Sequence, residues 1–338
     1  MKKSKFFVMS LILTLILTMT LLGCSNGGTE TSGEEGASEE TYVLKVANAG
    51  AIGDDRDQAL QEFAKIVDEK SNGKVKVEVY SGGTLGSWRD TIEGLEAGIV
   101  QIVIESIGTL EAYSDTASID AYPFLYKDLD HYLKVIEGEV GRELMDVVAK
   151  EGGFVLMGPS HRGARIATTT KKIENVEDVA GLKIRAPGIQ MYIKTWEYLG
   201  ATPTPMDVSE IYTGIQQGTV EGQENPLMFS YGGAYYEVCD YLIMTNHVYS
   251  TDVFIFNDDY FNSLPEDVQV VLRESAEEAA RFRTQLVIEQ EEEIIEKFKE
   301  KGVEVVYPEL EGFYKKLEDF SQEFPHLKEW VEKIQAVQ

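Results

Sequence analysis

The sequence predicts an α/β protein with two lobes, each an open sheet flanked by helices. Segments with strand and helix patterns alternate from residue 42 onward, and the alternation restarts near residue 154. The length of 338 residues suggests two lobes. Helical spacing then continues from Pro265 to about Lys301, which is long for a helix of a globular protein. We expect this helix to cross both lobes or to kink.

The first half of the chain has the element order of a parallel α/β sheet. Residues 42–48 alternate as a strand does, whereas Leu60, Phe63 and Val67 have helical spacing. The expected elements are, in order, a strand at 42–48, a helix at 56–70, a strand at 75–80, a helix at 88–97 and a strand at 100–105. This order predicts an open parallel sheet covered by helices.

The second half repeats this pattern after a helical region near residues 135–150. The expected elements are strands at 154–158, 165–169 and 182–186, helices at 191–199, 208–217 and 230–237, and an extended apolar run at 253–256. In the long helix that follows, Val268, Leu272 and Leu286 are among the apolar positions that set the helical pattern.

The N-terminus is typical of an export signal. Three lysines among the first five residues precede an apolar run at 6–22, and Leu21-Leu22-Gly23-Cys24 resembles a bacterial lipobox. We therefore expect residues 1–23 to be a lipoprotein signal peptide. Residues 25–40 have no large apolar side chain, so residues 24–40 are expected to be the lipidated Cys24 and a flexible tether. The protein would then be extracytoplasmic and lipid-anchored to the cell membrane; a plain transmembrane anchor is the alternative.

The composition argues against several classes of function. The formal net charge of −27 is the opposite of what nucleic-acid binding requires. Cys239 is the only cysteine besides Cys24, so no intramolecular disulfide is expected in the mature domain. The four histidines lack metal-ligand spacing, and residues 23–27 match the nucleophile-elbow pattern only inside the expected tether. We expect neither an enzyme nor a cofactor or metal site.

Two short segments favour the binding of a small organic acid. Arg185 follows Gly181 closely, and Asn225 lies between Gly222 and Pro226, so each segment places a strong hydrogen-bonding group near a glycine or proline. A guanidinium offers a rigid fork of donors that fits a carboxylate, and a nearby amide could orient the bound acid. The pattern therefore indicates capture of an acid without a subsequent reaction.

From about Tyr42 to the C-terminus the chain resembles the DctP-type solute-binding proteins of TRAP (tripartite ATP-independent periplasmic) transporters. The segments that carry the resemblance include GTLG at 83–86, YPFL at 122–125, RGAR at 162–165, GLKIRAP at 181–187, LGATPTPM at 199–206 and GQENP at 222–226. The resemblance implies two α/β lobes that close over an organic acid, a long helix across both, and transporter membrane subunits as partners. It places residues 42–161 and 251–290 mainly in the first lobe, and residues 162–250 and 291–338 mainly in the second.

The resemblance also assigns ligand contacts. Arg185 takes the position of the family's principal carboxylate-binding arginine, Arg165 that of a second cleft arginine, and Asn225 that of the cleft asparagine. Asn48 and Glu105 take first-lobe positions that contact the distal polar end of the ligand in some relatives. The alternatives are an internal ion pair for either arginine, a turn-stabilising role for Asn225 and a fold-internal role for Glu105.

Two positions depart from the family pattern. Val208 stands where several relatives carry an aromatic side chain against the ligand, and Trp88 stands where others carry a polar residue. The aromatic wall is therefore expected on the first lobe, unless Trp88 belongs to the core. The ligand stays open among sugar acids, C4-dicarboxylates and shorter hydroxy or keto acids. A carboxylate at Glu105 suits hydroxyl groups and repels a second ligand carboxylate, which favours a hydroxylated monocarboxylate.

The sequence thus predicts an extracytoplasmic receptor that captures a small organic acid by hinge closure and delivers it to a TRAP transporter membrane complex. A solute-binding sensor lipoprotein that feeds a signalling receptor is the alternative, because it would keep the pocket and change only the docking surface.

Overall fold

The computed structural model describes residues 41–338. The expected signal peptide, the lipidation of Cys24 and the tether up to residue 40 lie outside the described residues. The strands are β1 (Tyr42–Ala47), β2 (Val75–Tyr80), β3 (Ile102–Ser106), β4 (Phe154–Thr169), β5 (Lys183–Ala186), β6 (Thr202–Pro205), β7 (Gly222–Pro226), β8 (Tyr241–Asn257) and β9 (Glu304–Val306). The helices are α1 (Asp55–Lys70), α2 (Trp88–Glu96), α3 (Leu129–Glu137), α4 (Glu139–Gly152), α5 (Gln190–Leu199), α6 (Val208–Gln216), α7 (Leu227–Gly232), α8 (Asp258–Ser263), α9 (Glu266–Glu300), α10 (Glu311–Lys316) and α11 (Lys328–Gln335).

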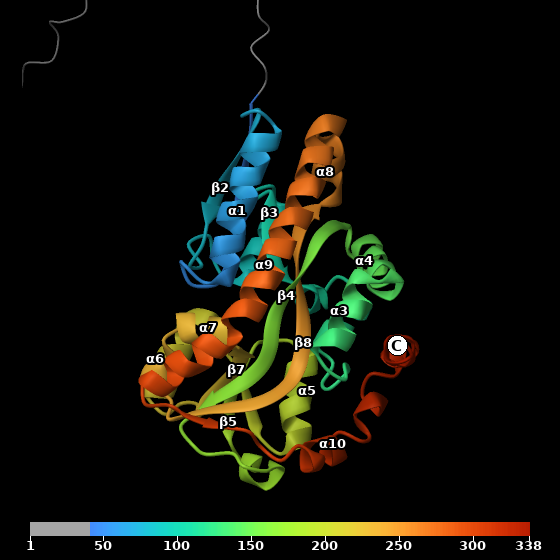
Figure 1. Cartoon of the computed structure of the whole chain (residues 1–338). Helices are drawn as coiled ribbons and strands as arrows, with labels where there is room; N and C mark the ends of the chain where they lie inside the picture. Colours follow the sequence, from blue (N-terminus) through green and yellow to red (C-terminus); the bar gives the residue numbers. More distant parts are fainter. Residues whose placement is uncertain (1–40) are drawn as a thin grey trace, which may run out of the picture. The chain divides into compact units, whose positions relative to one another are not determined.

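The strands form one mixed sheet with helices packed on it (Figure 1). Its strand order is β2-β1-β3-β8-β4-β7-β5-β6, and β9 pairs with β8. The pairs β1–β2 and β1–β3 are parallel, as the sequence predicts. The pairs β5–β6 and β5–β7 are also parallel, although β6 and β7 were not expected as strands. The central pairs β3–β8, β8–β4 and β4–β7 are antiparallel, which the sequence pattern did not indicate. We call the part built on β1, β2 and β3 lobe I, and the part built on β5, β6 and β7 lobe II.

Strands β4 and β8 run side by side through both lobes (Figure 1). The separate strands expected at 154–158 and 165–169 are two parts of β4, and the run expected at 253–256 is only the C-terminal end of β8. In lobe I, Phe254 of β8 lies opposite Ile104 of β3. In lobe II, Ile243 of β8 lies opposite Ala167 of β4. The same two strands therefore connect the lobes.

Strand β4 contains an extra residue where it passes from one lobe to the other. Between His161 and Ala164, three steps along β4 match two steps along β8, which is a β-bulge. Gly163 in this bulge has a φ of +91°, a conformation that glycine adopts without a steric penalty. Side chains three residues apart on a regular strand point to opposite faces. The extra residue instead returns Arg162 and Arg165 to the same face, where both line one cavity.

Helix α9 crosses both lobes, which confirms the expectation of one long spanning helix (Figure 1). Leu272 and Ala276 pack into the core under the lobe I sheet, whereas Ile294 and Phe298 pack into a cluster of lobe II. Gly158 of β4 permits the close approach of α9, because a Cβ at that position would lie 2.5 Å from the carbonyl oxygen of Ala276. Within residues 41–338, neither α9 nor any other helix combines the length and apolar character needed to cross a membrane.

The C-terminal segment, which the resemblance places mainly in the second lobe, packs on helices that follow β3. Phe320, Leu327 and Ile334 are buried in one cluster with Val135 of α3 and Leu144 of α4. Burial of these three apolar side chains holds the C-terminal end of the chain against the fold.

Candidate ligand-binding site

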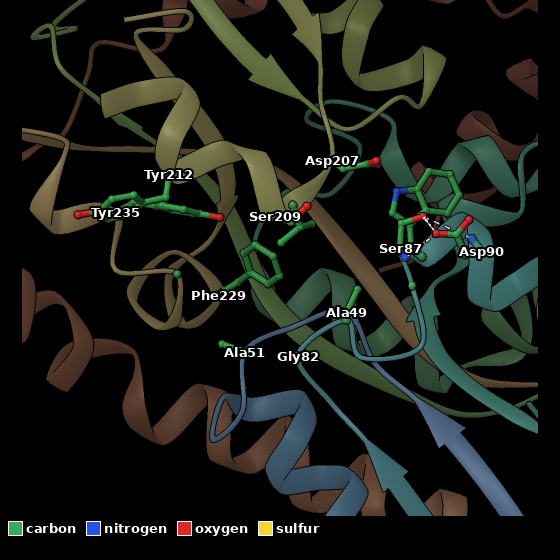
Figure 2. A pocket seen from close by; sticks show the side chains of 15 residues that line it. Ala49, Ala51, Gly82, Ser87, Asp90, Asp207, Ser209, Tyr212, Phe229 and Tyr235 are labelled. Atoms are coloured by element: carbon green, nitrogen blue, oxygen red, sulfur yellow. Dashed lines mark hydrogen bonds between the residues drawn. The ribbon is translucent and has the colours of Figure 1, made fainter. Parts of the chain in front are cut away.

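Two adjoining cavities lie between lobe I and lobe II. The aromatic cavity, drawn in Figure 2, has a volume of about 430 Å³. The arginine cavity has a volume of about 40 Å³. The two cavities share Ala49, Trp88, Val208 and Phe229 as lining residues. Figure 2 shows the Phe229 ring between the loop that carries Ala49 and the start of α6, so it stands where the lobes face each other.

Most of the ligand residues that the sequence predicts come together at the arginine cavity. The predicted residues that line it are Arg165, Arg185, Asn225, Glu105, Trp88 and Val208. Asn48 does not line either cavity. Its Oδ1 accepts a hydrogen bond from the backbone N–H of Gly50 at 2.8 Å, so it shapes the loop that follows β1.

Arg185 of β5 is a buried guanidinium whose end has no protein partner. It is 2% exposed, and its Nε donates to the carbonyl oxygen of Met206 at 2.8 Å. Neither Nη1 nor Nη2 makes a hydrogen bond or an ion pair within residues 41–338. Burial lowers the pKa of Arg185 to about 10; the Glu224 carboxylate opposes this shift and Arg165 adds to it. The side chain is thus positioned through Nε, and its two terminal nitrogens can bind an anion.

Arg165 of β4 lines the same cavity but is already paired. Its Nε and Nη2 bind the two carboxylate oxygens of Glu224 at 2.5 and 2.6 Å, and its guanidinium lies 4.4 Å from the centre of the Tyr192 ring. His247 Nε2 lies 3.2 Å from the same carboxylate. Burial would raise the pKa of Glu224, but Arg165 and His247 outweigh it and lower the pKa to about 2. The internal ion pair that the sequence left open for Arg165 is therefore present.

Asn225 of β7 is oriented by a chain of buried amide and hydroxyl groups. Its Nδ2 donates to Gln223 Oε1 at 2.7 Å. Gln223 in turn donates through Nε2 to the hydroxyl oxygens of Thr168 at 2.8 Å and Ser230 at 3.0 Å. Because Nδ2 is committed to Gln223, the amide plane of Asn225 is fixed. Within the described residues Oδ1 has no hydrogen-bond donor, so it can accept one from a ligand.

Asp252 of β8 holds together three arginines next to the arginine cavity. Arg56 binds its two carboxylate oxygens at 2.6 and 2.9 Å, and Arg283 of α9 binds Oδ2 at 2.6 Å. Arg162 reaches Oδ1 only at 3.4 Å. Burial would raise the pKa of Asp252, but the three guanidinium groups hold it well below its usual range. Glu105, expected to receive ligand hydroxyls, lies 2.9 Å from Nη2 of Arg56, so its charge is offset within the protein.

The apolar wall of the site is made by both lobes. Trp88 lines both cavities and also packs against the core. It is therefore both a pocket residue and a core residue, the two alternatives that the sequence left open. Phe229 of lobe II is 9% exposed and lines both cavities as well. The sequence predicts the aromatic wall on lobe I, because Val208 stands where several relatives carry an aromatic residue. Phe229 supplies an aromatic side chain beside Val208.

Among the lining residues that were not assigned from the sequence are the large side chains of Arg56, Arg162, Tyr192 and Phe229. Arg162 stands in the segment that resembles the family, three residues before Arg165, a spacing that regular strand geometry would turn away from the site. Tyr192 lies under the Arg165 guanidinium, and its hydroxyl is buried without a hydrogen-bond partner among the described residues. Only its position two residues into an expected helix, after GLKIRAP, could have drawn attention to it.

Two contacts join the lobes across the site. Arg89 of α2 donates to the carbonyl oxygen of Gly188. The carboxylate of Glu111 accepts from the backbone N–H of Gln190, the first residue of α5, at 3.1 and 3.2 Å. Burial raises the pKa of Glu111, while the Gln190 N–H and Arg89 act in the opposite direction. Lobe I thus contacts the N-terminal end of a lobe II helix, where a negative charge is favourable.

Two α/β lobes that meet around a buried guanidinium, whose terminal nitrogens have no partner within residues 41–338, form a site suited to a small anionic solute. The model of the family "Bacterial extracellular solute-binding protein, family 7" (DctP) matches residues 49–326. The chain belongs to this family, which confirms the resemblance found in its sequence.

Relatives and solved structures cover nearly the whole described chain. The sialic acid-binding periplasmic protein SiaP of Vibrio cholerae is 28% identical over 282 residues, which are 83% of this chain and 88% of SiaP. A TRAP periplasmic solute-binding protein of Roseobacter denitrificans with bound L-galactonate is 27% identical, with a TM-score of 0.83 over 88% of this chain and 100% of that one. Another, from Sulfurospirillum deleyianum with bound succinate, is 27% identical, with a TM-score of 0.81 over 88% of this chain and 100% of that one.

Membership of this family defines the general role of the chain. The family consists of extracellular solute-binding proteins of transport systems, and it is not a family of enzymes. The protein is therefore an extracytoplasmic receptor for a solute that a TRAP transporter carries.

Proposed function

We propose that this protein captures a small hydroxylated carboxylate, such as a sugar acid, and delivers it to the membrane subunits of a TRAP transporter. The observation that carries the proposal is Arg185, whose Nη1 and Nη2 have no partner within residues 41–338 although the side chain is buried. A carboxylate fits these two nitrogens through parallel charge-assisted hydrogen bonds. The relatives named above bind sialic acid, L-galactonate and succinate, so a C4-dicarboxylate is the second candidate ligand.

The remaining site residues contribute to ligand recognition in different ways. Arg165 contributes positive charge while its geometry is set by Glu224. Asn225 orients the bound acid through its amide, and Glu105 accepts ligand hydroxyls. Trp88 and Val208 cover the carbon chain, and Asn48 acts through the loop after β1.

Ligand capture proceeds by hinge closure. We assign residues 42–161 and 251–290 mainly to lobe I and residues 162–250 and 291–338 mainly to lobe II, with β4, β8 and α9 as the connections. The C-terminal end of the chain, with Phe320, Leu327 and Ile334, is the exception, because it packs on α3 and α4. A ligand favours the closed form when only that form lets both lobes contact it. The Arg89 and Glu111 contacts across the site, which need the lobes to be close, support this assignment.

The N-terminal sequence supports a lipid anchor at Cys24, reached through cleavage after residue 23. The Cys24→Ser precursor should then leave the membrane fraction without losing ligand affinity. Fractionation of cells that express each form tests this, with binding measured on both. Continued membrane association of the serine form would show an uncleaved anchor instead.

The proposed function is tested by a thermal-shift screen of the domain from residue 41 onward against organic acids. A ligand at about 100 times its dissociation constant adds about 2.7 kcal/mol of stability, which is readily measured as a higher melting temperature. The matched control is Arg185→Ala, whose melting temperature should not respond to the same acid. A screen in which no organic acid stabilises the wild type would overturn the proposal.

A further inference from the structure

Arg162 is a buried guanidinium that the protein satisfies only in part. It is 6% exposed and lines the arginine cavity. Its single ionic contact runs from Nη1 to Asp252 Oδ1 at 3.4 Å, which is longer than the 2.7–2.9 Å typical of charge-assisted hydrogen bonds. Its Nε is buried without a hydrogen-bond partner among the described residues. Nη2 also makes no contact of this kind there.

The Asp252 carboxylate is shared among three arginines. Arg56 and Arg283 approach the carboxylate at 2.6 to 2.9 Å, closer than Arg162 does. Burial lowers the pKa of Arg162; Asp252 opposes the shift, and Arg56 and Arg165 add to it. Arg162 therefore has hydrogen-bonding capacity that nothing in residues 41–338 fills, and a buried donor without a partner is costly.

The charges around the cavity leave one positive charge uncompensated. The network around Asp252 holds three guanidinium groups and three carboxylates, which are Arg56, Arg162, Arg283, Asp55, Asp252 and Glu105. Arg165 and Glu224 form a separate neutral pair. Arg185 is left over, so one ligand carboxylate completes the balance. Asp54 and Asp120 are not counted in this balance, because burial raises the pKa of each to about 7.

Arg162 and Glu105 line the same cavity and are linked through shared partners. Arg56 Nη2 lies 2.9 Å from Glu105 Oε2 and 2.9 Å from Asp252 Oδ1, the oxygen that Arg162 also approaches. A donor and an acceptor that line one small cavity match a hydroxyl group, which can accept from Arg162 and donate to Glu105. A carboxylate can accept from Arg162, but it cannot donate to Glu105 and is repelled by it.

We infer that Arg162 and Glu105 form a subsite for a hydroxyl-bearing carbon of the ligand, so that the protein selects hydroxylated monocarboxylates against dicarboxylates. The inference rests on the proposed function, in which Arg185 binds the single acid group. In it Arg162 is a ligand-contacting residue that determines specificity, separate from the carboxylate grip at Arg185.

The test compares ligands that share a carbon chain and differ in oxygen groups. Calorimetry on the wild type would use D-galactonate, its diacid D-galactarate and the unsubstituted hexanoate, with D-glucuronate and D-glucarate as a second set. The wild type should bind the hydroxylated monoacid at least about tenfold more tightly than its diacid or hexanoate. Arg162→Met should weaken binding of the monoacid about 10- to 100-fold, the range for hydrogen bonds to a charged group. Its affinity for hexanoate should not change.

Two further variants keep the test decisive. Arg142→Met removes an exposed arginine of α4 and should bind every ligand as the wild type does. Arg162→Lys keeps the charge without the planar fork and should still lose affinity, which covers the case in which the methionine variant unfolds. An Arg162→Met or Arg162→Lys variant that binds the sugar acid as wild type does would overturn the inference alone. A wild type that prefers the diacid or succinate would overturn the inference and make a dicarboxylate the ligand, while capture of an organic acid would stand. A wild type that binds no organic acid would remove the proposed function and this inference with it.

Discussion

Arg165 and Glu224 are joined by two parallel contacts, Nε to Oε2 at 2.5 Å and Nη2 to Oε1 at 2.6 Å. Arg185, in the same cavity, has no comparable partner within the described residues. The charge of Arg165 is therefore balanced by a carboxylate of the protein, whereas the charge of Arg185 is left for a ligand to balance. Truncation of Arg185 should therefore lower mainly ligand affinity, whereas truncation of Arg165 should lower mainly the stability of the ligand-free protein.

Arg185→Ala should lower ligand affinity at least about 100-fold, because it removes two charge-assisted hydrogen bonds worth about 1.5–3 kcal/mol each. The free energy of unfolding without ligand should stay equal or increase, since the arginine is buried without an anion. Arg185→Lys should also bind poorly, because lysine lacks the planar fork. Calorimetry beside urea unfolding measures both quantities. Near wild-type affinity in the lysine variant would mean that charge alone, and not geometry, holds the ligand.

Arg165→Ala should instead destabilise the ligand-free protein by about 3–5 kcal/mol, because it leaves the Glu224 carboxylate buried without its main partner. The double variant Arg165→Met, Glu224→Gln should recover most of this loss, since no charge is then left unpaired. Urea unfolding of the three proteins is the measurement. If Arg165→Ala unfolds like the wild type, the ion pair contributes little and Arg165 serves the ligand alone.

His161 should make the ligand-free protein lose stability in mild acid. Burial lowers the pKa of His161 from 6.5 to about 3. Arg283 lowers this pKa further, whereas Asp252 raises it. The folded state thus favours the neutral ring, so the stabilisation is complete above pH 6.5 and is lost as the pH falls toward 3. The His161→Phe variant keeps a ring against Tyr249 and should show a flatter profile below pH 6.5. Unfolding free energies measured at a series of pH values decide it; parallel profiles would refute the assignment.

Glu111→Ala should speed ligand release. It removes the acceptor for the Gln190 N–H, a contact of about 0.5–1.5 kcal/mol, which exists only while the lobes are close. The dissociation rate should rise up to about tenfold, and the association rate should change little. Glu197→Ala is the matched control, because Glu197 is an exposed residue of the same helix as Gln190, and within residues 41–338 its carboxylate pairs with Lys194 alone. Stopped-flow kinetics that show unchanged release would place this contact outside the closing motion.

The sequence predicted most of the fold because the relevant patterns are local. Apolar spacing located α1, α2, α5, α6 and α9 to within a few residues. It located the two ends of β4 and only the C-terminal end of β8, because bulges and the left-handed conformation of Gly163 and Asn246 break the alternation in the middle of these strands. The antiparallel centre of the sheet depends on strand pairing between distant segments, which local patterns do not encode.

The candidate site was predicted as a set of residues but not as a set of interactions. The residue types and motifs pointed to Arg185, Arg165 and Asn225, and all three line one cavity. What neutralises Arg165 was not readable, because Glu224 becomes its neighbour only when β7 pairs with β4. Arg162 could not be predicted as a site residue for a related reason, because the bulge at Gly163 decides on which face of the sheet its side chain lies.

The ion pairs of Asp252 with arginines of α1, β4 and α9 limit how the ligand specificity of this receptor can change in evolution. A substitution in that network alters folding and recognition together, so most such changes would be eliminated before a new preference could arise. Val208 and Phe229 touch the same solute space without carrying any of these charges. Homologues with a different ligand preference are therefore expected to differ first at these two apolar positions and to keep the ionic network around Asp252.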